Sequence, residues 1–114
     1  MPDSSPEGVV AAFFAAMNAH DADAAAVLVA PTVEIALGSH VFVGQEAVRE
    51  LAAQQDPQLE FETIPVSFAG DGNRVEVAAR RVQRWRSSGE IAAEDDVQAR
   101  FVVADGVITH ASLA

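Results

Sequence analysis

The chain has 114 residues, half of them hydrophobic, which suits one folded domain with a single core and excludes a disordered chain. It has no cysteine, which excludes disulfides, thiol catalysis and thiolate metal sites. A net charge of −10 disfavours nucleic acid and anionic membrane surfaces as partners, and no apolar run is long enough to span a bilayer. Met1–Ser5 also shows no targeting segment, so we expect a soluble cytoplasmic protein.

The first predicted element is an amphipathic helix from Glu7 to Ala19. Ser5 can cap this helix, and Pro6 suits its first turn. Its apolar residues recur at helical spacing and form one stripe. They are Val9, Val10, Phe13, Phe14 and Met17. Met1–Ser5 is expected to be a flexible tail, and residues 6–114 a single domain.

Two further helices and a short hairpin are expected in the first half of the chain. A short helix over Ala22–Val29 ends before Pro31, because the residue before a proline is driven out of the helical region. Thr32–Leu37 is predicted to be a strand, with His40–Val43 returning beside it. A third helix is predicted over Gln45–Gln55.

The second half is predicted to be a meander of antiparallel strands. Leu59–Phe68 alternates, but its phase slips by one near Thr63–Pro65, which is typical of a bulge or an edge strand. Three strands follow, joined by turns at Ser87-Ser88-Gly89 and Asp105-Gly106. They are Arg74–Arg86, Glu90–Val103 and Val107–Leu113. Helices followed by an antiparallel sheet predict an α+β fold, in which a curved sheet wraps the helices around a conical cavity.

The register of these strands predicts which side chains face the cavity. Pairing the first hairpin around Ser87-Ser88 places apolar residues on one face and charged residues on the other, and a one-residue slip would mix them. The expected pairs are Trp85–Ile91, Gln83–Ala93, Arg81–Asp95, Ala79–Val97 and Val77–Ala99. Across the next turn Phe101 is expected to pair with His110, which would bring His110 to the cavity face.

The predicted site is a mostly apolar cavity with a few polar groups at its mouth, as in many small-molecule pockets. Its apolar walls are expected to be Phe13, Phe14, Met17, Val33, Ile35, Leu37, Ala99 and Phe101. The polar groups are expected to be Arg81, Gln83, Trp85, Asp95 and His110. His110 is a natural proton carrier near neutral pH, and Asp95 would be a general base if desolvation raised its pKa. We expect no metal, because three scattered histidines lack an acidic partner at defined spacing.

The same residues also have purely structural explanations. Arg81 and Asp95 can form a cross-strand salt bridge, in which the arginine would make the carboxylate a poorer base. His110 can simply fill space near a strand end, and Trp85 can be a contact between two copies of the chain. The apolar stripe of the first helix can be core packing before it is a ligand surface.

Four stretches carry a resemblance to a known superfamily. They are Val10–Asp21 (VAAFFAAMNAHD), Ala30–Ala36 (APTVEIA), Val43–Leu51 (VGQEAVREL) and Phe101–Ile108 (FVVADGVI). In this order and spacing, over roughly residues 6 to 113, the chain resembles nuclear-transport-factor-2-like proteins, and among them the SnoaL-like and ketosteroid-isomerase-like proteins. The resemblance implies an α+β conical barrel that commonly forms a homodimer through its convex sheet face. This fold hosts isomerases, cyclases, epoxide hydrolases, dehydratases and plain binding modules.

The resemblance also implies where the residues of the steroid isomerases would lie. Their oxyanion-hole tyrosine corresponds to Phe13, and their general base to Ile35, with Glu34 on the opposite face. Their second acid lies on the strand that carries Asp95 and Asp96. Two of the three catalytic positions are thus apolar here, which argues against ketosteroid isomerisation by that mechanism.

Two functional classes remain open from the sequence. The first is a cofactor-free isomerase, cyclase or hydrolase on a small apolar, steroid- or polyketide-like substrate, with Asp95 and His110 carrying protons and Arg81 orienting or stabilising charge. The second is a non-catalytic binding or dimerisation module whose cavity is filled by its own side chains.

Overall fold

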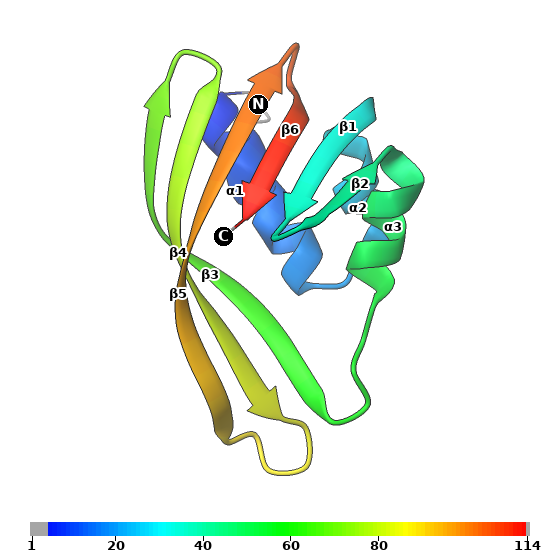
Figure 1. The fold of residues 1–114 in the computed structure, drawn as a ribbon, viewed down its shortest axis with the longest axis vertical. Helices are drawn as coiled ribbons and strands as arrows, with labels where there is room; N and C mark the ends of the chain where they lie inside the picture. Colours follow the sequence, from blue (N-terminus) through cyan, green and yellow to red (C-terminus); the bar gives the residue numbers. More distant parts are fainter. Residues whose placement is uncertain (1–4, 114) are drawn as a thin grey trace.

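A computed structural model describes residues 5–113, which fold as helices packed on a curved sheet (Figure 1). The elements in chain order are α1 (Pro6–Asn18), α2 (Ala22–Val27), β1 (Val29–Leu37), β2 (His40–Val43), α3 (Gln45–Ala53), β3 (Leu59–Asp71), β4 (Arg74–Trp85), β5 (Ile91–Ala104) and β6 (Val107–Leu113). The expected α+β fold is confirmed, and each predicted helix and strand is present with small shifts at its ends. The expected tail, apart from Ser5, lies outside the described residues.

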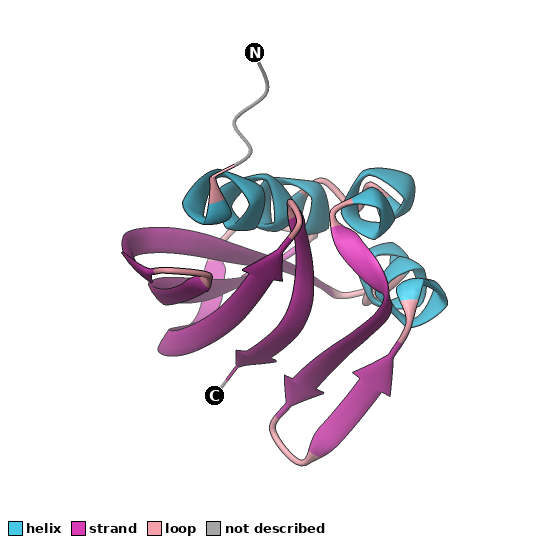
Figure 2. Ribbon diagram, turned by 90° about the horizontal axis from the view of Figure 1, so that it is seen from above, coloured by secondary structure: helices cyan, strands magenta, loops and turns pink. Residues whose placement is uncertain are grey.

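The sheet has the strand order β2-β1-β6-β5-β4-β3. Its neighbours are antiparallel except β1 and β6, which run parallel. The helices lie along one side of the sheet, as the view from above shows (Figure 2). We call the sheet face that packs on the helices the concave face, and the other the convex face. The sheet is curved (Figure 1). Because β2 and β3 are its two unpaired edges, it is open rather than a closed barrel.

Side-chain caps begin the first two helices. The Gly8 amide donates to Ser5 Oγ at 3.1 Å, and the Ala24 amide donates to Asp21 Oδ1 at 3.1 Å. Each cap satisfies an amide that has no partner within the helix. The apolar stripe of α1 then faces the sheet, with Val9, Val10, Phe13 and Phe14 buried.

Phe101 on β5 is the centre of the core. It is 1% exposed and contacts two rings of α1 edge-to-face, Phe13 at 6.1 Å and Phe14 at 5.5 Å between ring centroids. Small and β-branched residues from β1, β4 and β6 surround this cluster. The space between α1 and the sheet is therefore filled by aromatic packing at this level.

The edge strand β3 is irregular, as its sequence predicts. Its register shifts between Pro65 and Ser67, and Pro65 has no amide hydrogen to donate. Next to this bulge the side chain of Asn18, the last residue of α1, pairs with the strand backbone. Asn18 Nδ2 donates to the Thr63 carbonyl at 2.8 Å, and the Thr63 amide donates to Asn18 Oδ1 at 2.9 Å. This double hydrogen bond fixes the end of α1 to the sheet edge.

Candidate functional site

The concave face carries a charged pair directly beside the apolar core. Arg81 on β4 pairs with Asp95 on β5, as the sequence predicts. Because side chains alternate along a strand, Arg81 shares the face of buried Ala79, and Asp95 shares the face of buried Val97. Three more expected pairs are confirmed: Gln83–Ala93, Ala79–Val97 and Val77–Ala99.

The two charges lie at the end of the concave face that the helices do not cover, which we call the open end. Arg81 Nη2 and Asp95 Oδ2 are 3.7 Å apart, and the side chains are 47% and 55% exposed. The lower parts of β3, β4 and β5 extend past the helix ends (Figure 1). The remaining ion pairs of residues 5–113 lie on the convex face or on α3. The open end of the concave face thus offers a carboxylate and a guanidinium within reach of solvent.

The apolar residues expected to line the cavity are brought together, but they fill it. All belong to one cluster in which Met17 and Leu37 are partly buried: Phe13, Phe14, Met17, Val33, Ile35, Leu37, Ala99 and Phe101. Ile35 is 4% exposed and Ala99 is 1% exposed, so neither presents a free surface. These residues form a floor beneath the open end rather than the walls of a deep cavity.

His110 lies on the opposite face, so the expected Phe101–His110 pair is wrong. Val103 pairs with Ile108, but the register then shifts, and Phe101 pairs with Ala111 while Val102 pairs with His110. The extra residue turns every later side chain to the other face. His110 is therefore exposed on the convex face, where its Nε2 lies 3.6 Å from Glu34 Oε2.

The expected Trp85–Ile91 pair is wrong for a similar reason. The β4–β5 register shifts between Gln83 and Arg84, so Ile91 pairs with Arg84. On its other side Trp85 still pairs in regular register, with Leu59 of β3. Trp85 therefore keeps the face of Gln83 and Arg81, at the far end of the concave face.

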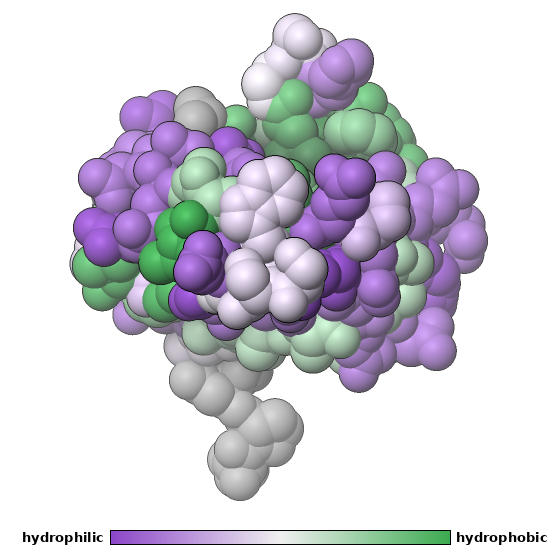
Figure 3. Space-filling model, turned by 90° about the horizontal axis from the view of Figure 1, so that it is seen from below, coloured by the Kyte–Doolittle hydropathy of each residue, from purple (hydrophilic) through white to green (hydrophobic). Residues whose placement is uncertain are grey.

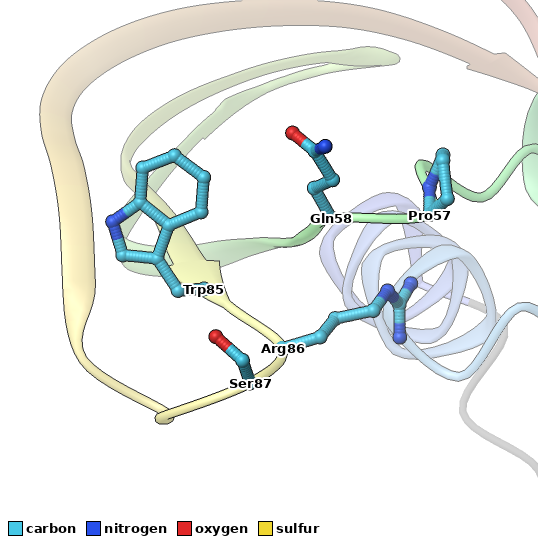
Figure 4. A pocket seen from close by; sticks show the side chains of 5 residues that line it. All are labelled: Pro57, Gln58, Trp85, Arg86 and Ser87. Carbon is cyan, nitrogen blue, oxygen red and sulfur yellow. The ribbon is translucent and has the colours of Figure 1, made fainter.

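A pocket of about 360 Å³, which we call the mouth pocket, opens at this end, beside the turn between β4 and β5. It is lined by Pro57, Gln58, Trp85, Arg86 and Ser87. Trp85 and Gln58 rise from two facing segments toward the same side (Figure 4). The view from below shows hydrophobic side chains as separate green areas among hydrophilic ones (Figure 3). The sequence does not predict this pocket, because residues 57 and 58 lie in the connection between a predicted helix and a predicted strand and show no periodic pattern.

Arg86 joins the two sides of this pocket. Its amide donates to the Gln58 carbonyl at 2.9 Å, and its Nε donates to the Asp56 carbonyl at 2.8 Å. The Asp56 carboxylate accepts the amides of Gln58 at 2.8 Å and Leu59 at 3.0 Å. These two amides, with a smaller contribution from the Arg86 charge, lower the pKa of Asp56 below its usual range.

The described residues give no sign of a metal site or a membrane span. Among residues 5–113, no group of three or more histidine, aspartate or glutamate side chains is placed to hold a metal ion. Within the same range, no helix is both long and apolar enough to cross a membrane.

What the open end offers is hydrogen bonding, charge stabilisation and proton exchange above an apolar floor.

A family model described as a SnoaL-like domain matches residues 10–111. A search of curated proteins finds no match to this chain. An NTF2-like protein from Burkholderia xenovorans LB400 superimposes with a TM-score of 0.78 at 22% identity, covering 96% of this chain and 87% of that chain.

Two further structures contain small molecules. A hypothetical protein of ketosteroid isomerase-like fold from Catenulispora acidiphila DSM 44928, in complex with trimethylamine, has a TM-score of 0.81 at 16% identity and covers 96% of this chain and 85% of its own. TerC co-crystallised with polyporic acid has a TM-score of 0.81 at 19% identity and covers 96% of this chain and 89% of its own. From the family match over most of its length and from the shared fold, this chain belongs to the SnoaL-like domain family and has an NTF2-like fold.

Proposed function

We propose that this chain binds a small, largely apolar organic molecule at the open end of the concave face and acts on it as a cofactor-independent acid–base isomerase or cyclase. One observation carries the proposal. Among the strands of residues 5–113, Asp95 is the one carboxylate, and Arg81 the one arginine, that side-chain alternation places on the concave face. Both stand next to an apolar floor, and both are half exposed.

The two side chains divide the chemistry between them. The Asp95 carboxylate takes a proton from a carbon next to a substrate carbonyl, and the electron pair of that C–H bond moves into the carbonyl to form an enolate. An Arg81 N–H group donates a hydrogen bond to the enolate oxygen. Where the substrate has a carbon–carbon double bond next to the deprotonated carbon, the enolate is a dienolate, and return of the proton to its far carbon shifts the double bond and completes an isomerisation. Attack of the enolate carbon on a second carbonyl, with the proton delivered to the new alkoxide, completes a cyclisation.

Gln83 and Trp85 extend this surface in the direction of the pocket at the mouth. Gln83 follows Arg81 on the same face and is only partly exposed, so its amide can orient a polar group of the ligand. The neighbours crystallised with polyporic acid and with trimethylamine support a fold that accepts small organic molecules. His110 has no part in the proposed chemistry, because it lies on the other face.

A ligand screen with paired variants tests the proposal. Steroids, polyketide-like aromatics and terpenoid ketones are screened by thermal shift, since a ligand present at 100 times its Kd stabilises the folded state by about 2.7 kcal/mol. We expect a rise in Tm that is lost in Arg81→Met and Asp95→Asn. The matched controls are Arg80→Met and Asp96→Asn, which break an ion pair of similar length (3.6 Å) on the convex face. A Tm rise that all four variants retain would contradict the proposed site.

A second candidate function is favoured by the filled core. The contacts of Phe13 and Phe14 with Phe101 leave the helix-covered space closed, and Arg81 already pairs with Asp95. A chain that uses its fold only for binding or dimerisation needs no more than this. No Tm rise across the whole panel would favour a dimerisation module with a filled core over the enzyme.

We also propose that the chain works in the cytoplasm as a homodimer formed through the convex face. Exposed apolar side chains support this surface: Val41 is 64% exposed, Val43 61% and Ile64 40%. Alternation places all three on the convex face. Light scattering checks the proposal, because a single species of twice the chain mass is expected, and Val41→Asp should convert it to monomer.

A further inference from the structure

We propose that the mouth pocket is an entrance subsite for a planar conjugated ring that carries a hydroxyl or carbonyl oxygen. The proposal rests on the function proposed above and names one part of the molecule that would be bound. Its apolar walls are the indole of Trp85 and the ring of Pro57, and its polar lining is the Gln58 amide, the Ser87 hydroxyl and the Arg86 side chain.

The indole of Trp85 is the main reason to expect a flat ring. It is 43% exposed, although it is the largest side chain in the protein. Of the ring contacts between described residues, none involves Trp85. An exposed, unstacked indole favours an offset or edge-to-face contact with another aromatic ring. The pocket volume of about 360 Å³ is at the lower end of the range for small-molecule sites, which suits one ring system.

The Gln58 amide supplies a specific hydrogen bond. In Figure 4 its side chain stands between Trp85 and Pro57 and points to the same side as the indole. No hydrogen bond among residues 5–113 engages this side-chain amide, although the Gln58 backbone amide and carbonyl are both bonded. An amide can donate to a carbonyl oxygen or accept from a hydroxyl hydrogen, and either group on the ring satisfies it.

The pocket is held in shape before a ligand arrives. The two hydrogen bonds of Arg86 fix Asp56 and Gln58 against the start of the β4–β5 turn. On the other side, the Trp85 amide donates to the Glu90 carbonyl at 2.9 Å, and the Trp85 carbonyl accepts from Gly89 at 2.8 Å. A site that needs no ordering on binding keeps more of its interaction energy as affinity.

The spacing along β4 sets the length of the molecule. Trp85 and Arg81 are four residues apart on the same face, which at about 3.3 Å per residue separates them by about 13 Å. A ligand that stacks on Trp85 and reaches Asp95 and Arg81 with its reacting carbonyl is therefore elongated. We infer a molecule of two or three fused or linked rings, with the conjugated ring at the mouth and the carbonyl toward the core.

The fluorescence of Trp85 tests this subsite directly. The chain has one tryptophan and no tyrosine, so its emission reports on this pocket alone. The probe is 2-acetylnaphthalene, a planar ring ketone, and its saturated counterpart acetylcyclohexane is the ring control. We expect 2-acetylnaphthalene to change the emission in a saturable way and acetylcyclohexane to bind more weakly. Gln58→Ala should weaken binding about fivefold, the value of one hydrogen bond.

Gln55→Ala is the matched control, because Gln55 lies exposed in the same connection but does not line the pocket. A non-saturable change in emission, or an equal loss in both glutamine variants, would overturn the subsite. If binding is saturable and depends on Gln58, but the Tm rise is unchanged in Arg81→Met and Asp95→Asn, the subsite stands and the proposed function is rejected. If the Tm rise depends on Arg81 but 2-acetylnaphthalene leaves the Trp85 emission unchanged, the proposed function stands and the subsite is rejected.

Discussion

The two ends of β4 and β5 differ although they belong to the same two strands. At the end covered by α1, the concave face carries Val75, Val77 and Ala99, all fully buried. At the open end, the same face carries Arg81 and Asp95, both half exposed. Strand alternation is equally regular in both, so the difference comes from the helix that covers one end. Buried apolar packing and exposed charge are therefore separated along the strands rather than between the two faces.

This separation explains why a charged pair is tolerated so close to the core. Among the described residues no charged side chain is buried. Arg81 lies level with the end of α1, because Asn18, the last residue of α1, bonds to Thr63, the β3 partner of Arg81. An exposed ion pair contributes little to stability, typically about 0–1 kcal/mol. The open end can therefore vary in sequence at little cost to folding.

The largest test of this comparison is Phe101→Ala. Removing a ring that packs on Phe13 and Phe14 leaves a cavity in the covered end, and we expect a loss of about 3–5 kcal/mol in the free energy of unfolding. Urea denaturation followed by circular dichroism measures it. Arg81→Met serves as the partner variant from the open end and should change the same quantity by less than about 1 kcal/mol. Equal losses in both would break the comparison.

A smaller effect is expected from Asn18→Ala, at the boundary between the two ends. The change removes both hydrogen bonds to Thr63 and should cost about 1–3 kcal/mol. Hydrogen exchange provides the local measurement, because the Thr63 amide should lose protection more than amides of β5. Asn73→Ala, in the exposed turn before β4, is the control. Unchanged protection at Thr63 would show that α1 is not fixed to the sheet edge by this side chain.

The smallest expected effect is the pH dependence contributed by Asp56. Its pKa is lowered in the folded state, chiefly by the amides of Gln58 and Leu59, so its stabilising contribution is full above the ordinary pKa. That contribution is lost as the pH falls through the lowered pKa, in the range of about pH 4 and below. Tm measured from pH 6 downward should fall less steeply in Asp56→Asn than in the unmodified chain. Parallel curves would show that the turn does not depend on this charge.

Most of the fold follows from the sequence, because helix caps, apolar stripes and turn residues act locally. The bulge before His110 was not predicted, although the spacing of Ile108, Ala111 and Leu113 indicates it. Three apolar residues that fall out of alternation by one position indicate an inserted residue. The Thr109 hydroxyl, which donates to the Val102 carbonyl at 3.2 Å, is part of that irregular geometry.

The mouth pocket could not be predicted for a different reason. It depends on hydrogen bonds between Arg86 and the connection that contains Asp56, two segments far apart in the sequence. Neither segment has a periodic pattern, and backbone carbonyls are acceptors in every residue type. The Arg81–Asp95 pair, in contrast, was predictable because it lies within a regular hairpin whose register is set by its apolar face.

The parallel pairing of β1 with β6 has a consequence for how the chain reaches its native state. Within the described sheet, this pairing connects the β1–β2 hairpin to the meander, and it joins Val29 to Ile108, which are far apart in the sequence. Contacts between residues so far apart require closing a long loop, which slows folding. β6 is the last strand of this sheet in chain order, so during synthesis the β1–β2 hairpin is made before its partner strand. Until β6 pairs with it, this edge of β1 has unpaired backbone groups, which is the feature that makes strand edges prone to pair with other chains.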